Sequence, residues 1–167
     1  MSKIERIRPA GLAAVLAFLL VAPAAAQLKT EKVLSYEVAK IIATTAVETC
    51  QAKGYRVSVT VVDRDGVTVV QMRGDGASPH TMEYSRRKAY TANTFRTNTS
   101  DYNKRFDDGD RVVLQQVTLP GVVAARGGVP IKVGDEVIGG AAISGSPGGN
   151  DEVCAQAGLD KAKDLLK

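Results

Sequence analysis

The feature that most constrains this fold is a pair of strand-like segments separated by a short turn. From Tyr55 to Val61, apolar residues alternate with polar ones, which is typical of a β-strand with one buried face. A second run rich in β-branched residues spans Val67 to Met72. The residues Asp63-Arg64-Asp65-Gly66 between the two runs favour a turn. We therefore predict a β-hairpin, around which the other elements must be arranged.

Helical patterns lie on both sides of this hairpin. The candidate N-caps of the four expected helices are, in order, Ser35, Ser78, Ser100 and Asn150. We expect the first helix to end at Gly54, the second to run to about Phe95, and the last to end at Leu166. Pro79 follows Ser78 at the first helical position, where its missing N–H costs nothing.

Three more short strands are expected before the last helix. They cover Val122 to Ala124, Gly127 to Ile131, and Val137 to Ser144 after a turn at Gly134-Asp135. The order is then helix, two strands, helices, three strands, helix. Because tight turns join the strands, we predict an α+β fold, an α/β/α sandwich with a five-stranded antiparallel sheet flanked by helices.

The N-terminus has the pattern of a secretory signal peptide. Basic residues precede an apolar run from Ala10 to Val21, Pro23 then breaks any helix, and small residues end at Ala26. The apolar run is much shorter than the roughly 20 residues that a membrane-spanning helix needs. We predict a signal peptide at residues 1–26, one domain at residues 27–167, no stable membrane insertion after cleavage, and a periplasmic or secreted location.

The charge of the mature chain gives little support to nucleic-acid binding. The formal net charge of +4 falls by two when Lys3, Glu5, Arg6 and Arg8 are removed with the leader, so the remaining domain is only mildly basic. Cys50 and Cys154 remain in the mature part, and an oxidising compartment would permit a disulfide between them. Two buried thiols that act as small apolar residues are the alternative.

His80 is the only histidine, and it lies at the start of the second expected helix. The positive end of the helix dipole disfavours protonation of its imidazole, which leaves a neutral nitrogen free to bind a metal such as haem iron. A surface histidine with no such role is the alternative. Tyr84, Arg87 and Lys88 fall roughly on the same side of this helix, where Arg87 or Lys88 could meet a ligand carboxylate, although such a charge run is often a solvated face.

Glycine clusters permit a backbone to approach a ligand closely. Gly127 and Gly128 form one cluster, and Gly145 begins another. Neither matches a phosphate-binding loop or a dinucleotide fingerprint, so tight turns explain them equally well. Hydrolytic catalysis has thin support, because a Ser-His-Asp or Cys-His arrangement would have to use His80 and no Gly-x-Ser-x-Gly motif is present.

Four groups of residues stand out along the predicted domain. They are Val61-Val62-Asp63-Arg64-Asp65-Gly66; Ser78-Pro79-His80-Thr81 with Arg87-Lys88-Ala89-Tyr90-Thr91-Ala92; Gly127-Gly128-Val129-Pro130-Ile131; and Gly139 through Gly145 with Asp151-Glu152-Val153-Cys154. Together and in this order they resemble the GlcG/HbpS-type haem-binding family, which is related to the C-terminal domain of PduO-type cobalamin adenosyltransferases.

The resemblance implies an α/β/α fold with a five-stranded antiparallel sheet, homo-oligomers, and a haem-binding or haem-handling role. It implies His80 as an axial ligand of haem and Lys88 as a pocket residue. Our leading hypothesis is an exported haem-binding protein, possible roles being storage, sensing or handling, and more a binding protein than a catalyst. The alternatives are a periplasmic accessory or enzyme acting on a small carboxylate or diol-derived metabolite, and a modulator of a membrane sensor kinase.

Overall fold

The computed structural model describes residues 28–147 and 149–167, so the predicted signal peptide lies outside the described residues. The chain divides into two units, residues 1–30 and 31–167, and all helices and strands described below belong to the second. No helix in the described ranges is both long enough and apolar enough to cross a membrane.

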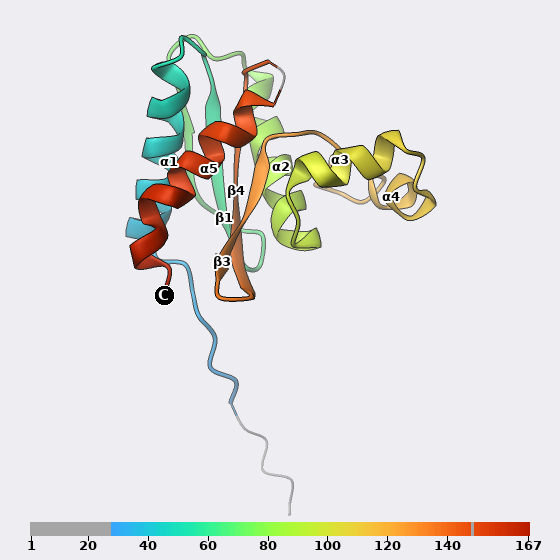
Figure 1. The fold of residues 1–167 in the computed structure, drawn as a ribbon, viewed down its shortest axis with the longest axis horizontal. Coiled ribbons are helices and arrows are strands. Elements are labelled where there is room, and N and C mark those ends of the chain that lie inside the picture. The colour runs from blue at the N-terminus through green and yellow to red at the C-terminus, as the bar shows by residue number, and fades with distance from the viewer. Residues whose placement is uncertain (1–27, 148) are drawn as a thin grey trace, which may run out of the picture. The chain divides into compact units, whose positions relative to one another are not determined.

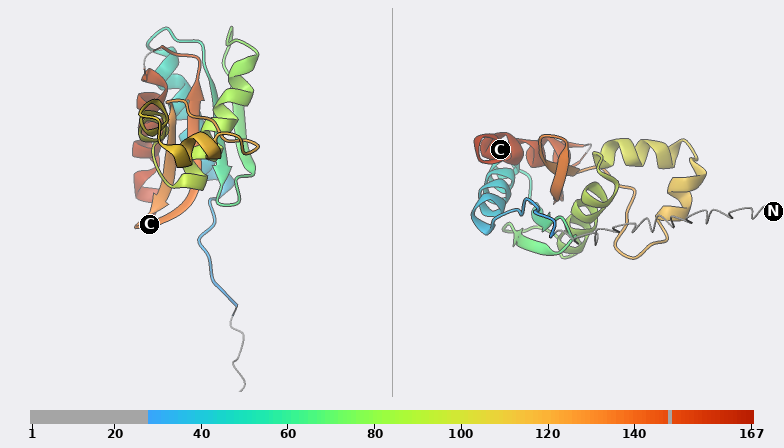
Figure 2. Two further views of the ribbon diagram at one scale, coloured as in Figure 1. Left: turned by 90° about the vertical axis from the view of Figure 1, so that its right-hand side faces the viewer. Right: turned by 90° about the horizontal axis from the view of Figure 1, so that it is seen from below.

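Within the second unit, helices cover both faces of an antiparallel sheet (Figure 1, Figure 2). Helices α1 and α5 pack on one face and α2 packs on the other, which confirms the predicted α+β class. Helices α3 and α4 extend beyond the edge of the sheet and form an arm (Figure 1). In chain order the elements are α1 Tyr36–Gln51, β1 Ser58–Asp63, β2 Thr68–Arg73, α2 His80–Phe95, α3 Thr99–Asp107, α4 Arg111–Gln116, β3 Gly128–Val133, β4 Glu136–Ser144, α5 Asn150–Ala162 and a 3₁₀ turn Lys163–Leu165.

The sheet of the described residues has four strands in the order β2-β1-β4-β3, so the predicted count of five is wrong. The expected strand from Val122 to Ala124 does not form. Its backbone groups are bonded by side chains of α2 instead: the carbonyl of Val122 accepts a hydrogen bond from Arg87, and the N–H of Val123 donates one to Thr91. The predicted hairpin is confirmed, with β1 paired to β2 and Val59 opposite Met72.

The main core lies between the sheet and the helices α1 and α5. Its fully buried members include Ile42 from α1, Val59 and Val61 from β1, and Ile143 from β4. Cys50 and Cys154 form a disulfide in this layer, with a Cα–Cα distance of 5.6 Å and no exposed surface. The bond joins the end of α1 to the first turns of α5, so the alternative of two free thiols does not apply.

The opposite face of the sheet meets α2 through small and polar groups. Ser58 on β1 hydrogen-bonds Thr81 at 2.7 Å, and Thr60 hydrogen-bonds Ser85 at 2.8 Å. A Cβ on Gly140 would lie only 2.3 Å from the carbonyl oxygen of Ala89, so the helix backbone rests directly on β4. This close approach fixes where the side chains of α2 can point.

Of the four expected N-caps, Ser35 is confirmed, and the residue before each of the other three helices differs from the expected cap by one or two positions. Ser35 accepts a hydrogen bond from the N–H of Val38 as predicted. Ser78 does not act as the expected cap of α2. Pro79 directly precedes this helix with helical dihedral angles, and within the described residues no side chain caps the helix start. The residue before α3 is Asn98, so Ser100 lies inside that helix. Likewise Asn150 is the first residue of α5, and Gly149 precedes it.

Replacing both cysteines by alanine should lower the free energy of unfolding by about 2–5 kcal/mol, because the unfolded chain loses a cross-link between residues 104 apart. Urea denaturation of the wild type and the double variant measures this loss. Dithiothreitol should lower the free energy of unfolding of the wild type by a similar amount, and it should not change that of the double variant. Two titratable thiols in the unfolded wild type, without reductant, would contradict the disulfide.

Candidate functional site

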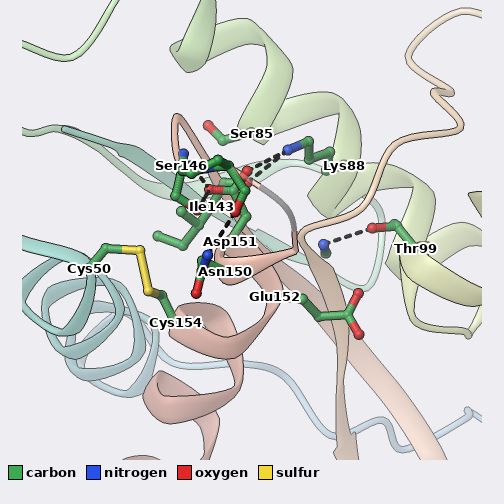
Figure 3. Close-up of polar contacts among 12 residues, drawn as sticks. Cys50, Ser85, Lys88, Thr99, Ile143, Ser146, Asn150, Asp151, Glu152 and Cys154 are labelled. Carbon is green, nitrogen blue, oxygen red and sulfur yellow. Dashed lines mark hydrogen bonds and ion pairs between the residues drawn. A yellow bond between two sulfur atoms is a disulfide. The ribbon is translucent and has the colours of Figure 1, made fainter. Parts of the chain in front are cut away.

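A cavity of about 490 Å³ opens beside α2, near the end of β4 and the first turn of α5. Its volume lies within the range of small-molecule and cofactor sites. The lining residues are His80, Tyr84, Lys88, Asn103, Ala124, Ala125, Arg126, Ser144, Gly145, Ser146, Gly149 and Asp151. They come from four separate parts of the chain, and Figure 3 shows the polar contacts at the inner end.

Three of the predicted site residues reach this cavity from a single helix face. His80, Tyr84 and Lys88 are spaced four residues apart on α2, so their side chains lie one above another. His80 is exposed, Tyr84 is partly buried and Lys88 is buried. The helix therefore carries an imidazole near the solvent and an ammonium at the bottom of the cavity.

Lys88 is held by an ion pair inside the protein (Figure 3). Its Nζ lies 2.9 Å from Oδ2 of Asp151, donates to the carbonyl of Ile143 at 3.2 Å, and lies 5.0 Å from the centre of the Tyr84 ring. Only 4% of the Lys88 side chain and 7% of the Asp151 side chain are exposed. The lysine charge is therefore compensated before any ligand arrives.

Asp151 is fixed by the loop that follows β4. Its second oxygen, Oδ1, accepts hydrogen bonds from the backbone N–H of Ser146 at 2.9 Å and from the Ser146 hydroxyl at 2.7 Å. Both carboxylate oxygens thus have partners, which a buried carboxylate requires. The set Lys88, Asp151 and Ser146 links α2, α5 and the loop after β4.

Of the four other predicted site residues, one lines the cavity and three do not. Gly145 lines the cavity, whereas Arg87, Gly127 and Gly128 lie outside its lining. A Cβ on Gly127 would come within 2.7 Å of Cβ of Asp151 and 3.0 Å of Nζ of Lys88, so this glycine leaves room for the ion pair. Gly128 leaves room for the backbone of α2, because a Cβ there would meet the carbonyl oxygen of Lys88 at 2.6 Å.

Part of the charge run on α2 forms a solvated face. Arg86 donates two hydrogen bonds of 2.8 Å to Glu83, one turn earlier. This contact holds the pKa of Glu83 below its ordinary value and raises the pKa of Arg86. Neither residue lines the cavity.

Sequence reasoning missed Arg126 and the roles of Ser146 and Asp151. Arg126 is an exposed lining residue of the cavity, and it has no ion pair with another residue in the described ranges. A signal for the buried pair was present, because Lys88 shares the buried face of α2 with Ser85, Ala89 and Ala92. A lysine among such neighbours must have a buried anionic or polar partner.

The described residues contain no group of three or more His, Cys, Asp or Glu side chains that could hold a metal ion. The assignment of His80 as a metal ligand stays a prediction.

Comparisons with known proteins agree on one family. Residues 34–160 match the model of a family described as "Haem degrading protein HbpS-like". Protein GlcG of Escherichia coli K12 is 32% identical over 117 residues, which cover 70% of this chain and 85% of GlcG. The crystal structure of HbpS has 36% identity and a TM-score of 0.74, over 80% of this chain and 93% of that one. A crystal structure of PduOC in complex with haem has 27% identity and a TM-score of 0.71, over 78% of this chain and 95% of that one.

Replacing Lys88 by methionine should lower the free energy of unfolding by about 3–5 kcal/mol, because the buried carboxylate of Asp151 then lacks its counter-charge. Removing both charges, with Lys88→Met and Asp151→Leu together, should recover much of this loss. Chemical denaturation gives the free energy of unfolding of the wild type, the single variant and the double variant. The matched control is Lys104→Met, which breaks the exposed pair with Asp108 and should change stability little. Equal effects of Lys88→Met and Lys104→Met would contradict a stabilising buried pair.

Proposed function

The chain belongs to the HbpS-like family, and on that premise we propose that it is an exported haem-binding protein that works as a homo-oligomer. The observation that carries the proposal is the cavity of about 490 Å³ in which His80, Tyr84 and Arg126 meet. These side chains offer an imidazole nitrogen, an aromatic ring and a cation.

The cavity residues fit the chemical groups of haem. The iron would accept an imidazole nitrogen from His80, which lies at the exposed end of the lining where a large planar ligand can enter. Tyr84, Ala124 and Ala125 provide aromatic and apolar surface for the macrocycle. An arginine guanidinium is well suited to the carboxylates of the propionates.

Arg126 is the residue to which we assign the propionate contact, in place of Arg87 or Lys88. The Lys88 ammonium is already paired with Asp151. Arg87 donates a hydrogen bond to the carbonyl of Val122 and lies outside the cavity lining. Arg126 lines the cavity, is exposed, and has no carboxylate partner in the described part of the chain.

Export and self-association belong to the same proposal. The buried disulfide between Cys50 and Cys154 supports an oxidising compartment such as the periplasm. Exposed apolar side chains at Val112, Leu114 and Leu119 on and after α4 support contacts between copies through the arm. The predicted signal sequence at residues 1–26 supplies the route of export.

Titration of the mature protein with haemin should produce a shifted Soret band that His80→Ala abolishes, because the imidazole provides the axial nitrogen. Arg126→Gln should keep the band and weaken binding about tenfold, the loss expected when one charge-assisted contact is removed. Arg111→Gln, which changes another exposed arginine away from the cavity, is the matched control. An unchanged haemin spectrum with the wild type would remove the haem proposal.

Expression of the full chain in a bacterial host should yield periplasmic protein that begins at Gln27, because Ala24 and Ala26 occupy the positions that signal peptidase reads. Intact mass and N-terminal sequencing give the answer. Replacing Ala24 and Ala26 by aspartate should block cleavage. Recovery of the wild type from the cytoplasm with its leader attached would refute the export proposal.

A further inference from the structure

The amine of Lys88 is a feature of the cavity that haem binding does not use. Two oxygens accept from its Nζ, Oδ2 of Asp151 and the carbonyl oxygen of Ile143. Because an ammonium has three N–H groups, one position on the nitrogen remains beyond these two partners. The Nζ also lies over the Tyr84 ring, 5.0 Å from the ring centre, and both residues line the cavity (Figure 3 shows the Lys88 contacts). Lys88 is a lining residue of the cavity although only 4% of its side chain is exposed, and we infer that the third position on its nitrogen faces a bound ligand.

The pair with Asp151 gives this nitrogen a route to a reactive form. A proton moved along the 2.9 Å hydrogen bond to Oδ2 leaves a neutral amine beside a neutral carboxyl group, so no net charge is left buried. A neutral lysine amine is a nucleophile toward carbonyl carbon. The two hydrogen bonds from Ser146 to Oδ1 hold the carboxyl group in position beside the amine.

The charge of the lining selects the ligand. Arg126 is an unpaired cation of the same cavity in the described residues, and guanidinium groups bind carboxylates in a fixed geometry. A molecule that satisfies both groups carries a carbonyl for the amine and a carboxylate for the guanidinium. We propose that Lys88 forms a Schiff base with a small 2-oxo acid whose carboxylate is held by Arg126, an activity that goes beyond haem binding.

The reaction needs no oxidant or reductant. The neutral amine nitrogen attacks the carbonyl carbon, a C–N bond forms, and the C=O π bond breaks. The nitrogen then loses one proton, which moves to the former carbonyl oxygen and gives a neutral carbinolamine. Asp151 then returns its proton to the hydroxyl group, the C–O bond breaks, and water leaves. The product is an iminium cation on Lys88 beside the Asp151 carboxylate, so the charge pair of the resting protein is restored.

Reductive trapping tests the proposal on the haem-free mature protein. The wild type is incubated with pyruvate and cyanoborohydride, and the product is examined by intact mass and by peptide mapping. We expect one carboxyethyl group per chain, located on Lys88. The peptide containing Lys132, an exposed lysine away from this cavity, provides the internal control.

Two variants and a second probe distinguish the role of Lys88 as the reacting amine from that of Arg126 as the carboxylate partner. Lys88→Arg keeps the charge for Asp151 and should abolish the adduct. Arg126→Gln should raise the half-saturating pyruvate concentration about tenfold, and acetone, which lacks a carboxylate, should react poorly with the wild type. Circular dichroism establishes that each variant is folded, and mapping of the wild type gives a result without any variant.

Three outcomes would overturn the proposal: no adduct on the wild type, an adduct on Lys132 as abundant as that on Lys88, or labelling that survives Lys88→Arg. Since the trapping contains no haem, its failure leaves the Soret measurement untouched, and failure of haem binding leaves the adduct untouched.

Discussion

The ion pair between Lys88 and Asp151 is the interaction on which the site depends. It connects the middle of α2 to the first turn of α5, and through Asp151 it also holds Ser146, just after β4. Two charges so far from solvent are costly, and the structure offsets this cost with a full set of hydrogen bonds on the carboxylate. Gly127 contributes by leaving the space that the pair occupies.

Much of the fold could be predicted because local patterns agreed with tertiary packing. The alternation from Tyr55 to Val61 located β1, and the cap at Ser35 is confirmed. The prediction of a strand from Val122 to Ala124 was wrong, although a short apolar run is typical of a strand. Side chains of α2 form the hydrogen bonds to the backbone of this segment instead. A competing hydrogen-bond partner that comes from another element leaves no local trace in the sequence.

Of the residues that line the candidate site, the sequence predicted three on α2 and Gly145 after β4. Residues three or four apart on a helix share a side, so spacing grouped His80, Tyr84 and Lys88. The same reasoning included Arg87, which lies outside the cavity lining. The opposite wall comes from Arg126, Ser146 and Asp151, and the pairing of Lys88 with Asp151 spans 63 residues. Helical periodicity carries no information on partners so distant, which is why the acid and the free arginine appeared only with the structure.

The arm formed by α3 and α4 has a consequence for the width of the cavity. Its apolar cluster, built around Tyr102, Val113 and Val122, is separate from the main core. Stacking of Tyr102 on Phe95 of α2 attaches it, as do hydrogen bonds that include one between Ser100 and Glu152. Small clusters of this kind open locally at a lower free energy than the whole domain. Because Asn103 on the arm lines the cavity, we expect local opening of the arm to change the width of the cavity while the main core stays folded.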